Sequence, residues 1–330
     1  MMDKIKVSII VPVFNAGPYL QKVAQSVFDQ SFTDYELIFV NDGSTDNSLS
    51  ILNELAQQDS RVMVFDQENK GATAARKMGW LRASAEYITF LDADDVFLEG
   101  GLLALMQECG NGDYDIVNGS FISVPNKRVW QIHTVEELGK TEYLDALMTG
   151  KNFGVMYASV YKKALFQESS FAFDKTIKVG EDVLMNLELC KRVDKVKNVK
   201  DIVYQYTEDT AGSVTSVIVR HPSYYIRFNK IRDSLIKALD PVYYTTTKEQ
   251  QEKKDNNEII NSFFSPFIEF DKVYYTKVKP LKNKVVKKNI YVYCLSNIWL
   301  TKITKVLLSL LFAVKNGVNG RSSENRKILF

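Results

Sequence analysis

The chain has 330 residues, of which 45% are hydrophobic and 25% are charged. These values exclude wholesale disorder and collagen-like or fibrous classes, and the length suits one large domain with an appendage or two modest domains. The formal net charge of +2 conceals an asymmetry, because residues 1–271 carry 29 Lys and Arg against 39 Asp and Glu, whereas residues 272–330 carry 13 against 1. This division predicts a basic tail with an anionic partner.

The cysteines and the N-terminal residues bear on the cellular compartment. Cys109, Cys190 and Cys294 are odd in number and widely spaced, which argues against a disulfide framework and fits a reducing environment. The first residues lead directly into strand-like sequence, without the apolar core and cleavage site of a secretory signal. We therefore expect a cytoplasmic protein, with the inner face of the cell membrane as an alternative location.

Strands and helices alternate over the first 91 residues. Apolar β-branched residues fill the first predicted strand, which indicates burial on both faces of a parallel sheet. Repeated βαβ units predict a doubly wound, mostly parallel α/β sheet with helices on both faces and every strand-to-helix loop at one edge. The predicted strands are 6–14, 35–40, 61–65 and 86–91; the helices begin at Gly17-Pro18, carry Leu49, Leu52 and Leu55, and cover 72–84.

Beyond residue 100 the pattern is less regular. The apolar segment 290–314 contains Lys302 and Lys305, and its uninterrupted stretches are shorter than the ~20 residues that a spanning helix needs. We expect a catalytic domain at 1–215 and a helical, basic C-terminal extension at 216–330. The predicted elements are helices at 102–108, 141–148, 182–192, 222–239 and 248–270, strands at 115–122 and 157–161, and a lysine-rich connector at 272–288.

An acidic cluster, Asp92-Ala93-Asp94-Asp95, follows the predicted strand that ends at Leu91. A strand of this kind delivers its carboxylates to the edge where open α/β sheets place their ligands. Adjacent carboxylates repel one another, and Mg²⁺ or Mn²⁺ shared with substrate phosphates would neutralise them. A solvated turn that caps the next helix is the alternative.

Together, five blocks of sequence resemble family 2 glycosyltransferases of the GT-A fold, nucleotide-diphospho-sugar transferases of the bacterial surface-polysaccharide type. Their order and spacing cover roughly residues 5 to 215, and the set is far more specific than any one member. The blocks are Val7 to Asn15, Val40 to Asp46, Asn69-Lys70-Gly71 with Ala75-Arg76, Leu91 to Asp95, and Gly180-Glu181-Asp182.

The resemblance implies a nucleotide site at the sheet edge. Asp42 would accept a hydrogen bond from uracil, and Asn69 and Gly71 would lie beside the nucleotide, where a glycine permits close approach. Arg76 would place a cationic fork near the diphosphate or the base. The residues alone leave alternatives: a helix cap for Asp42, as for Ser44 and Asp46, and a surface salt bridge for Arg76.

The first strand would supply the wall against which the base and ribose lie. The resemblance assigns that wall to Pro12, Phe14 and Asn15, although Phe14 taken alone fits the hydrophobic core better. Trp80 fits the packing face of its helix, whereas Trp130 fits either packing or a sugar platform. We expect His133 and His221, which lie outside every block, to be structural or surface residues.

The same resemblance implies the roles of the acidic residues. Asp92 would lie at the ribose and Asp94 would bind the divalent metal, Mn²⁺ or Mg²⁺, while Asp95 would either support them from behind or cap the next helix. Asp182 would be the general base that takes the proton from the acceptor hydroxyl, with inversion at the anomeric carbon. An ordinary acidic helix start is the alternative for Glu181-Asp182.

The implied function is transfer of one sugar per event from a UDP-sugar to a hydroxyl of a glycan acceptor, since the Gln-x-x-Arg-Trp signature of processive relatives is absent. The enzyme would be a hexosyl- or N-acetylhexosaminyltransferase, and a lipid-linked oligosaccharide of capsule, exopolysaccharide or lipopolysaccharide biosynthesis is the expected acceptor. The alternatives are a non-catalytic nucleotide-binding or assembly module and a sugar-phosphate nucleotidyltransferase.

The basic tail predicts an interfacial helix on an anionic membrane surface, because lysines precede an apolar stretch that contains Tyr291, Tyr293 and Trp299. Nucleic acid is not expected as a partner, since the tail has no recognised nucleic-acid motif. Instead of binding a membrane, segment 290–314 could pack on the catalytic domain or in a homodimer; these are the two alternatives. The lysines are Lys277, Lys279, Lys282, Lys284, Lys287 and Lys288.

Overall fold

A computed structural model describes residues 6–131, 137–174, 176–177, 179–208, 218–220, 222–264, 272–285, 291, 294–295, 298, 300–308 and 327–329. The chain forms two compact units. Unit 1 consists of Met1–Lys175 and Gly180–Thr210, and unit 2 of Thr176–Val179 and Ala211–Phe330. The domain boundary predicted at residue 215 lies outside the described residues and stays a prediction, and so do the roles expected for His133 and His221.

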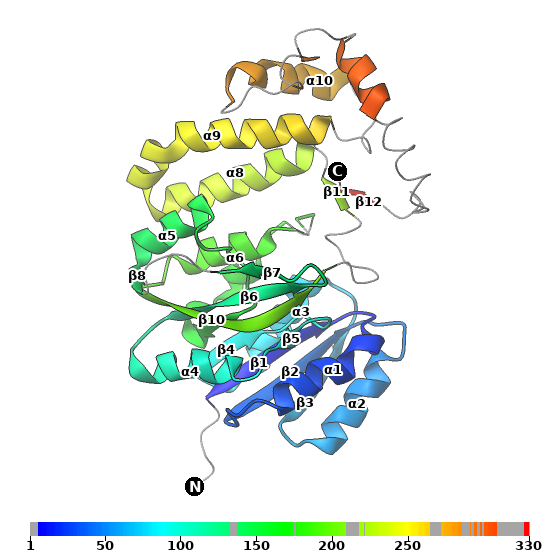
Figure 1. The fold of residues 1–330 in the computed structure, drawn as a ribbon, viewed down its shortest axis with the longest axis vertical. Helices are drawn as coiled ribbons and strands as arrows, with labels where there is room; N and C mark the ends of the chain where they lie inside the picture. The colour runs from blue at the N-terminus through cyan, green and yellow to red at the C-terminus, as the bar shows by residue number, and fades with distance from the viewer. Residues whose placement is uncertain are drawn as a thin grey trace. The chain divides into compact units, whose positions relative to one another are not determined.

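Unit 1 is built on one sheet with the strand order β3-β2-β1-β4-β9-β6-β10-β5 (Figure 1). β7 pairs with β6, and β8 pairs with β10. The strands are β1 (Val7–Val13), β2 (Tyr35–Asp42), β3 (Val62–Gln67), β4 (Tyr87–Phe90), β5 (Val96–Phe97), β6 (Ile116–Val124), β7 (Arg128–Trp130), β8 (Glu137–Gly139), β9 (Ser159–Lys162) and β10 (Lys195–Thr207).

The strand directions bring several loops to one edge of the sheet. β1 to β4 are mutually parallel, and β6 is parallel to β10. Because β9 is antiparallel to both β4 and β6, the two parallel groups point the same way. The carboxyl ends of β1, β2, β3, β4, β6 and β10 therefore share an edge, which confirms the predicted mostly parallel sheet and leaves β5, β7, β8 and β9 as antiparallel additions.

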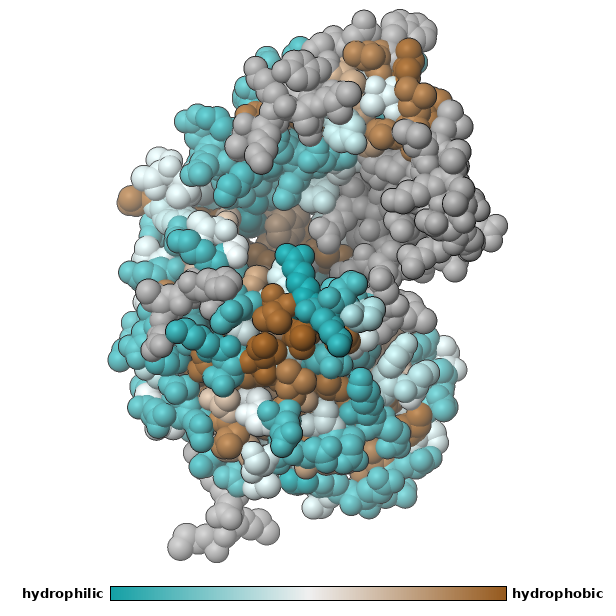
Figure 2. Space-filling view, viewed as in Figure 1, coloured by the Kyte–Doolittle hydropathy of each residue, from teal (hydrophilic) through white to brown (hydrophobic). Residues whose placement is uncertain are grey.

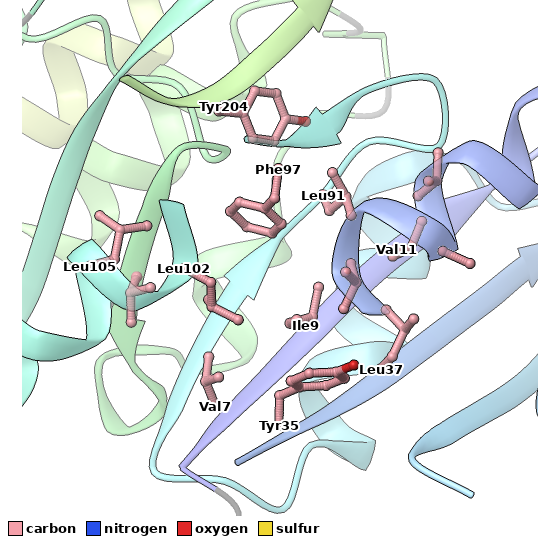
Figure 3. Packing of buried hydrophobic residues seen from close by; sticks show 14 of the residues in the cluster. Val7, Ile9, Val11, Tyr35, Leu37, Leu91, Phe97, Leu102, Leu105 and Tyr204 are labelled. Atoms are coloured by element: carbon pink, nitrogen blue, oxygen red, sulfur yellow. The ribbon is translucent and has the colours of Figure 1, made fainter. Parts of the chain in front are cut away.

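Helices cover both faces of this sheet. Alternate β1 residues, among them Val7, Ile9 and Val11, join the core that contains the buried faces of α1, α2 and α4, as Figure 3 shows in part. The intervening Ile10 faces Gly79 of α3 on the other side. The helices of unit 1 are α1 (Gly17–Phe28), α2 (Ser48–Gln58), α3 (Ala72–Arg82), α4 (Gly101–Asn111), α5 (Lys140–Thr149) and α6 (Glu181–Leu189), with short 3₁₀ helices η1 (Lys163–Leu165) and η2 (Glu168–Phe171).

Unit 2 is mainly helical, as predicted for the C-terminal extension. Its core contains Phe263 and Phe264 of α9 with Tyr275 and Val278 of α10. The Arg232 guanidinium of α8 donates to both carboxylate oxygens of Asp255 in α9, at 3.0 and 2.6 Å. The elements are β11 (Ile218–Arg220), α8 (Pro222–Leu239), α9 (Pro241–Phe263), α10 (Lys272–Val278), η3 (Lys279–Asn283), a helix at 300–308 and β12 (Lys327–Leu329), which pairs with β11.

Three predictions about the elements are wrong. The lysine-rich segment expected to be a connector is helical in α10 and η3, and α9 begins at Pro241, seven residues before the predicted start of 248. The long strand β10 has no counterpart among the predicted elements. Residues 265–270 of the helix predicted at 248–270 lie outside the described residues. Within the described part of the chain, no helix is long and apolar enough to cross a bilayer.

Gly79 allows α3 to lie close against β1. A Cβ at this position would lie 2.3 Å from Cγ2 of Ile10, a buried side chain of the strand. We therefore expect G79A to lower the free energy of unfolding by about 1–3 kcal/mol through overpacking. G110A in α4 is the matched control, because nothing lies within 4 Å of the added Cβ; Ala should stabilise that helix by about 0.5–1 kcal/mol. Urea unfolding measures both, and equal effects would contradict the contact.

Candidate active site

The loops after β1 and β2 are bonded to each other at the shared edge. The Asn15 backbone N–H donates to Ser44 Oγ at 3.0 Å, and the Asn15 side-chain oxygen accepts from the Thr45 backbone N–H at 2.7 Å. Asn15 has a φ of 51°, a left-handed conformation that Asn tolerates better than most residues. The neighbouring Phe14 is 51% exposed, so the expectation that it belongs to the core is wrong. Pro12 is half-buried one residue before the end of β1.

Asp42 holds the loop after β3. Its Oδ1 accepts from Gln67 Nε2 at 2.7 Å and from the Lys70 backbone N–H at 2.9 Å, and its Oδ2 accepts from the Gly71 backbone N–H at 2.8 Å. These bonds fix the peptide that leads into α3, so the helix-cap alternative for Asp42 is wrong. Gly43 brings Asn69 close as well, since a Cβ there would lie 2.8 Å from the Asn69 nitrogen.

Arg76 joins three carboxylates from two distant parts of the chain. Its residue is 4% exposed, and its guanidinium donates to Asp92 Oδ1 at 3.0 Å and to Asp182 Oδ1 at 3.2 Å. The Glu181 carboxylate lies 3.5 Å from the same guanidinium. The alternative of a surface salt bridge is therefore wrong, because Arg76 is buried between the acidic loop after β4 and the start of α6.

Asp95 is tied to β10 behind the acidic loop. It is fully buried, and its carboxylate accepts from the Tyr204 hydroxyl at 2.8 Å and from the Thr207 backbone N–H at 2.6 Å. Burial, together with repulsion from Asp92 and Asp94, raises its pKa well above the usual range. Tyr204 also accepts from the Asp92 backbone N–H at 3.1 Å. Asp95 is thus the supporting residue, and it does not cap α4, which begins at Gly101.

Asp182 lies in the first turn of α6, which follows Gly180 in a left-handed conformation with φ 84°. Its Oδ2 accepts from the Met156 backbone N–H at 3.3 Å, and its side chain is 17% exposed. Burial raises the pKa of Asp182, the Arg76 charge opposes this, and the Asp92 charge adds to it. Burial and the Asp182 charge raise the pKa of Glu181 to about 7, against the opposing charge of Arg76.

Comparison with known proteins identifies the family. The family model described as "Glycosyl transferase family 2" matches residues 8–169, which contain four of the five sequence blocks. The chain belongs to glycosyltransferase family 2.

Bacterial proteins are among its relatives. The chain is 30% identical to the Bacillus subtilis protein named "Uncharacterized glycosyltransferase EpsJ", over 64% of this chain and 63% of that protein. It is 30% identical to the "GalNAc(5)-diNAcBac-PP-undecaprenol beta-1,3-glucosyltransferase" of Campylobacter jejuni, over 53% of this chain and 59% of that protein. The chain thus spans about three fifths of the length of these relatives.

A solved structure shows the fold. Residues 1–349 of TarS from S. aureus, in complex with UDP-GlcNAc, superpose with a TM-score of 0.61 at 17% identity, covering 97% of this chain and 93% of that one. The GT-A fold expected from the sequence is therefore confirmed.

An aromatic group lies beside the acidic residues of this family 2 member. Tyr157 stacks on Tyr204 with ring centroids 4.8 Å apart and on Tyr206 at 5.8 Å. Burial and the nearby carboxylates of Asp92, Asp95 and Asp182 raise the pKa of the Tyr157 hydroxyl. Trp130 is stacked on Phe121 at 5.8 Å and has the Arg128 guanidinium 3.7 Å from its ring centroid. The indole ring is thus in contact with both Phe121 and Arg128, which favours packing over a sugar platform.

The acidic loop suits a divalent ion that a substrate shares. No set of three or more His, Cys, Asp or Glu side chains is arranged around a metal position within the described ranges. Mg²⁺ in nucleotide enzymes is commonly held by one or two carboxylates plus phosphate oxygens and water. Asp94 is half-buried in this loop and offers a hard oxygen ligand of that type. The residues present therefore fit a divalent ion, which Asp94 would help to hold.

Most predicted site residues lie on loops that the structure brings together. Asn15, Asp42, Asn69, Gly71, Arg76, Asp92 and Asp182 are joined through the bonds and close approaches described above. The sequence alone missed Gln67, which binds Asp42, and Tyr204 and Thr207, which bind Asp95. No regular alternation marks the strand that carries the last two, so no local pattern was available to find them.

Glu181 provides a test of the electrostatics. Its folded-state pKa of about 7 lies above the ordinary value of 4.5, so between these values the folded protein binds more protons than the unfolded chain. The free energy of unfolding should therefore fall as the pH rises through this window. E181Q has no carboxyl group to titrate at this position. The free energy of unfolding of E181Q minus that of the unmodified chain should therefore rise by about 1–3 kcal/mol as the pH increases from 4.5 to about 7.

Urea unfolding without nucleotide or divalent metal, at a series of pH values, measures this difference. E99Q, at an exposed position, is the control and should show no such trend. A flat difference between E181Q and the unmodified chain would contradict the raised pKa.

Proposed function

We propose that this chain transfers a single sugar from a UDP-sugar to a hydroxyl group of a glycan acceptor, with inversion at the anomeric carbon. The observation that carries the proposal is the buried Arg76, which joins Asp182 to Asp92 and so couples a candidate base to the loop of a candidate nucleotide site. The S. aureus protein with the same fold was solved with UDP-GlcNAc, which supports a uracil nucleotide as the donor.

Asp42 is suited to recognise the base. A carboxylate has about four lone-pair positions, and three of them accept from Gln67, Lys70 and Gly71. One position on Oδ2 is left to accept a uracil N–H. The exposed Phe14 ring, together with Pro12 and Asn15, would form the apolar wall for the base and ribose. Asn69 and Gly71 would lie along the nucleotide, with Asp92 at the ribose.

Asp182 is the proposed general base. Its carboxylate would take the proton of the acceptor hydroxyl as that oxygen forms a bond to the anomeric carbon and the bond to the diphosphate breaks. The Arg76 charge opposes the effect of burial, which raises the pKa of this carboxylate. Attack from the side opposite the leaving diphosphate inverts the configuration without a covalent intermediate.

Asp94 is the proposed ligand of a divalent ion, Mn²⁺ or Mg²⁺. When bound, such an ion stabilises the charge that develops on the departing diphosphate. Asp92 and Asp95 lie in the same loop, and Asp95 holds that loop against β10 through Tyr204 and Thr207.

The proposed acceptor is a lipid-linked oligosaccharide. The Campylobacter relative is named for an undecaprenol-linked acceptor, which supports this class. The reaction would then take place at the inner face of the cell membrane, in the synthesis of a surface glycan. A non-catalytic nucleotide-binding module is the second candidate, and a sugar-phosphate nucleotidyltransferase the third; the latter would release pyrophosphate from UTP, whereas the proposed reaction releases UDP.

D182N tests the base. The amide keeps the shape of the side chain but accepts no proton, so we expect the rate of UDP release in the presence of acceptor to fall by about 10²–10⁴-fold. Binding of UDP, measured by calorimetry, should stay within a factor of about three because the substitution leaves the nucleotide loops in place. D194N, at an exposed position outside the site, is the matched control. Undiminished turnover in D182N would refute the assignment.

D94A tests the metal ligand independently of turnover. UDP titrated with Mn²⁺ should bind roughly tenfold or more weakly to D94A than to the unmodified chain, whereas titration with EDTA should show little difference. D194A is the control for the loss of one exposed carboxylate. Equal Mn²⁺-dependent affinity in D94A and the unmodified chain would remove Asp94 from the metal site.

A further inference from the structure

In the helix at 300–308 of unit 2, two polar side chains lie inward with the partly buried Leu308, and four aliphatic side chains lie outward. Thr301 and Lys305 are 0% and 4% exposed. A helix on the surface of a globular protein ordinarily does the reverse, with its apolar stripe facing the core. The exposed aliphatic residues, here called the outer stripe, are Leu300 at 46%, Ile303 at 55%, Val306 at 59% and Leu307 at 54%.

Specific bonds fix this orientation. The Thr301 hydroxyl donates to the Cys294 carbonyl at 2.7 Å. The Lys305 ammonium donates to the Phe263 carbonyl in α9 and lies 4.7 Å from the centroid of the Phe263 ring. A rotation that turned the outer stripe inward would break these bonds and leave a buried carbonyl without its donor, which is costly. The outward position of the aliphatic residues is therefore a property of how unit 2 packs.

The outer stripe is continuous along the helix. Ile303 comes three residues after Leu300, and Val306 and Leu307 come three and four residues after Ile303, which places the stripe on neighbouring turns of one face. In Figure 2, brown hydrophobic atoms gather on the surface near the top right, over the helix that Figure 1 draws in orange-red. A surface of this kind on a soluble protein marks a site of interaction.

Positive charge accompanies the stripe in unit 2. Lys277, Lys279, Lys284 and Lys302 are exposed, and the sequence from 272 to 323 contains no Asp or Glu. A second copy of this chain on the stripe would bring like charges together, which opposes association. Nucleic acid would satisfy the lysines but not the aliphatic side chains. An anionic lipid surface satisfies both, with acyl chains for the stripe and headgroup phosphates for the ammonium groups.

We propose that the helix at 300–308 binds the surface of an anionic phospholipid bilayer, with Leu300, Ile303, Val306 and Leu307 inserted below the headgroups and the lysines of unit 2 in contact with lipid phosphates. The proposal is independent of the proposed function, because a non-catalytic chain would bind the bilayer equally well. Lys305 takes no part in the contact, since it is buried against Phe263.

Flotation of the full chain with vesicles tests the proposal. Vesicles of phosphatidylcholine with phosphatidylglycerol should carry the protein to the top of the gradient, and vesicles of phosphatidylcholine alone should bind it at least roughly tenfold more weakly. Binding to the anionic vesicles should also weaken as salt is added, because salt screens exposed charges. Equal binding to both kinds of vesicle would overturn the proposed role of the lysines.

I303D with L307D tests the outer stripe. We expect the double variant to lose roughly tenfold or more of the affinity for anionic vesicles, because charged groups oppose insertion. I226D with V242D changes the net charge equally at two exposed aliphatic positions of α8 and α9, at 41% and 73% exposure, and should lose less than about threefold. Equal losses in the two double variants would overturn the stripe.

Two further measurements keep the test decisive. K279Q with K284Q leaves the stripe intact and should lower binding to anionic vesicles by roughly fivefold per lysine, whereas K230Q with K237Q, exposed positions in α8, should not. The thermal unfolding midpoint of each variant checks that it folds.

Light scattering without lipid tests whether a second copy of the chain covers the stripe instead. If the unmodified chain is a dimer and I303D with L307D is a monomer, a second copy covers the stripe and the proposal is refuted.

Discussion

The organisation of the site depends on one buried cation. Arg76 is 4% exposed and has three carboxylates within reach, from Asp92, Glu181 and Asp182. Removing a guanidinium from water is expensive unless ion pairs and hydrogen bonds replace the lost hydration. Burial is the main cause of the raised pKa values of Glu181 and Asp182, and the excess of negative charge that three acids leave around one cation adds to it. A nucleotide diphosphate would add further negative charge to this edge. A second cation would offset this charge, and this electrostatic argument, more than any single ligand, supports the proposal of a divalent ion at Asp94.

The first half of the fold was predictable from the sequence, whereas the ion pairs of Arg76 in the site were not. Each of β1 to β4 is a short apolar run followed by a helix with its own periodicity, and these signals are local. Right-handed connections between parallel strands are enough to bring Asp42, Asp92 and the loop at Asn69 to one edge of the sheet. The partners of Arg76 do not follow from any local pattern, because Asp182 lies 106 residues further along the chain. The resemblance to family 2 placed both residues in one site, but only the coordinates show that they form an ion pair.

β10 shows a different limit of the sequence. Charged residues interrupt it at Lys195, Lys197 and Lys200, and its register with β6 shifts between Asn198 and Tyr204, so no regular alternation marks the strand. Its pairing is nevertheless what brings the Tyr204 hydroxyl to both Asp92 and Asp95. The error at α9 has another cause, because the Asp240-Pro241 pair is a good N-terminal signal: Asp240 accepts from the Tyr243 backbone N–H at 2.8 Å. That helix start could have been predicted, whereas the role of Tyr204 depends on non-local pairing.

The basic tail illustrates why hydropathy along a sequence does not define a surface. Lys302 and Lys305 interrupt the same apolar segment and contribute equally to its mean hydropathy. In the structure, however, Lys302 is exposed, whereas Lys305 is 4% exposed and donates to the Phe263 carbonyl. With Lys305 directed inward, Ile303, Val306 and Leu307 occupy the outer face. Burial lowers the pKa of Lys305 to about 8, so the packing of this helix carries an electrostatic cost that an inward Leu would not. A sequence adapted only to a stable helical core would place Ile303 or Leu307 inward. The observed arrangement lacks the stabilisation that burial of these aliphatic side chains would provide, and it leaves them exposed for contact with the acyl chains of the proposed bilayer.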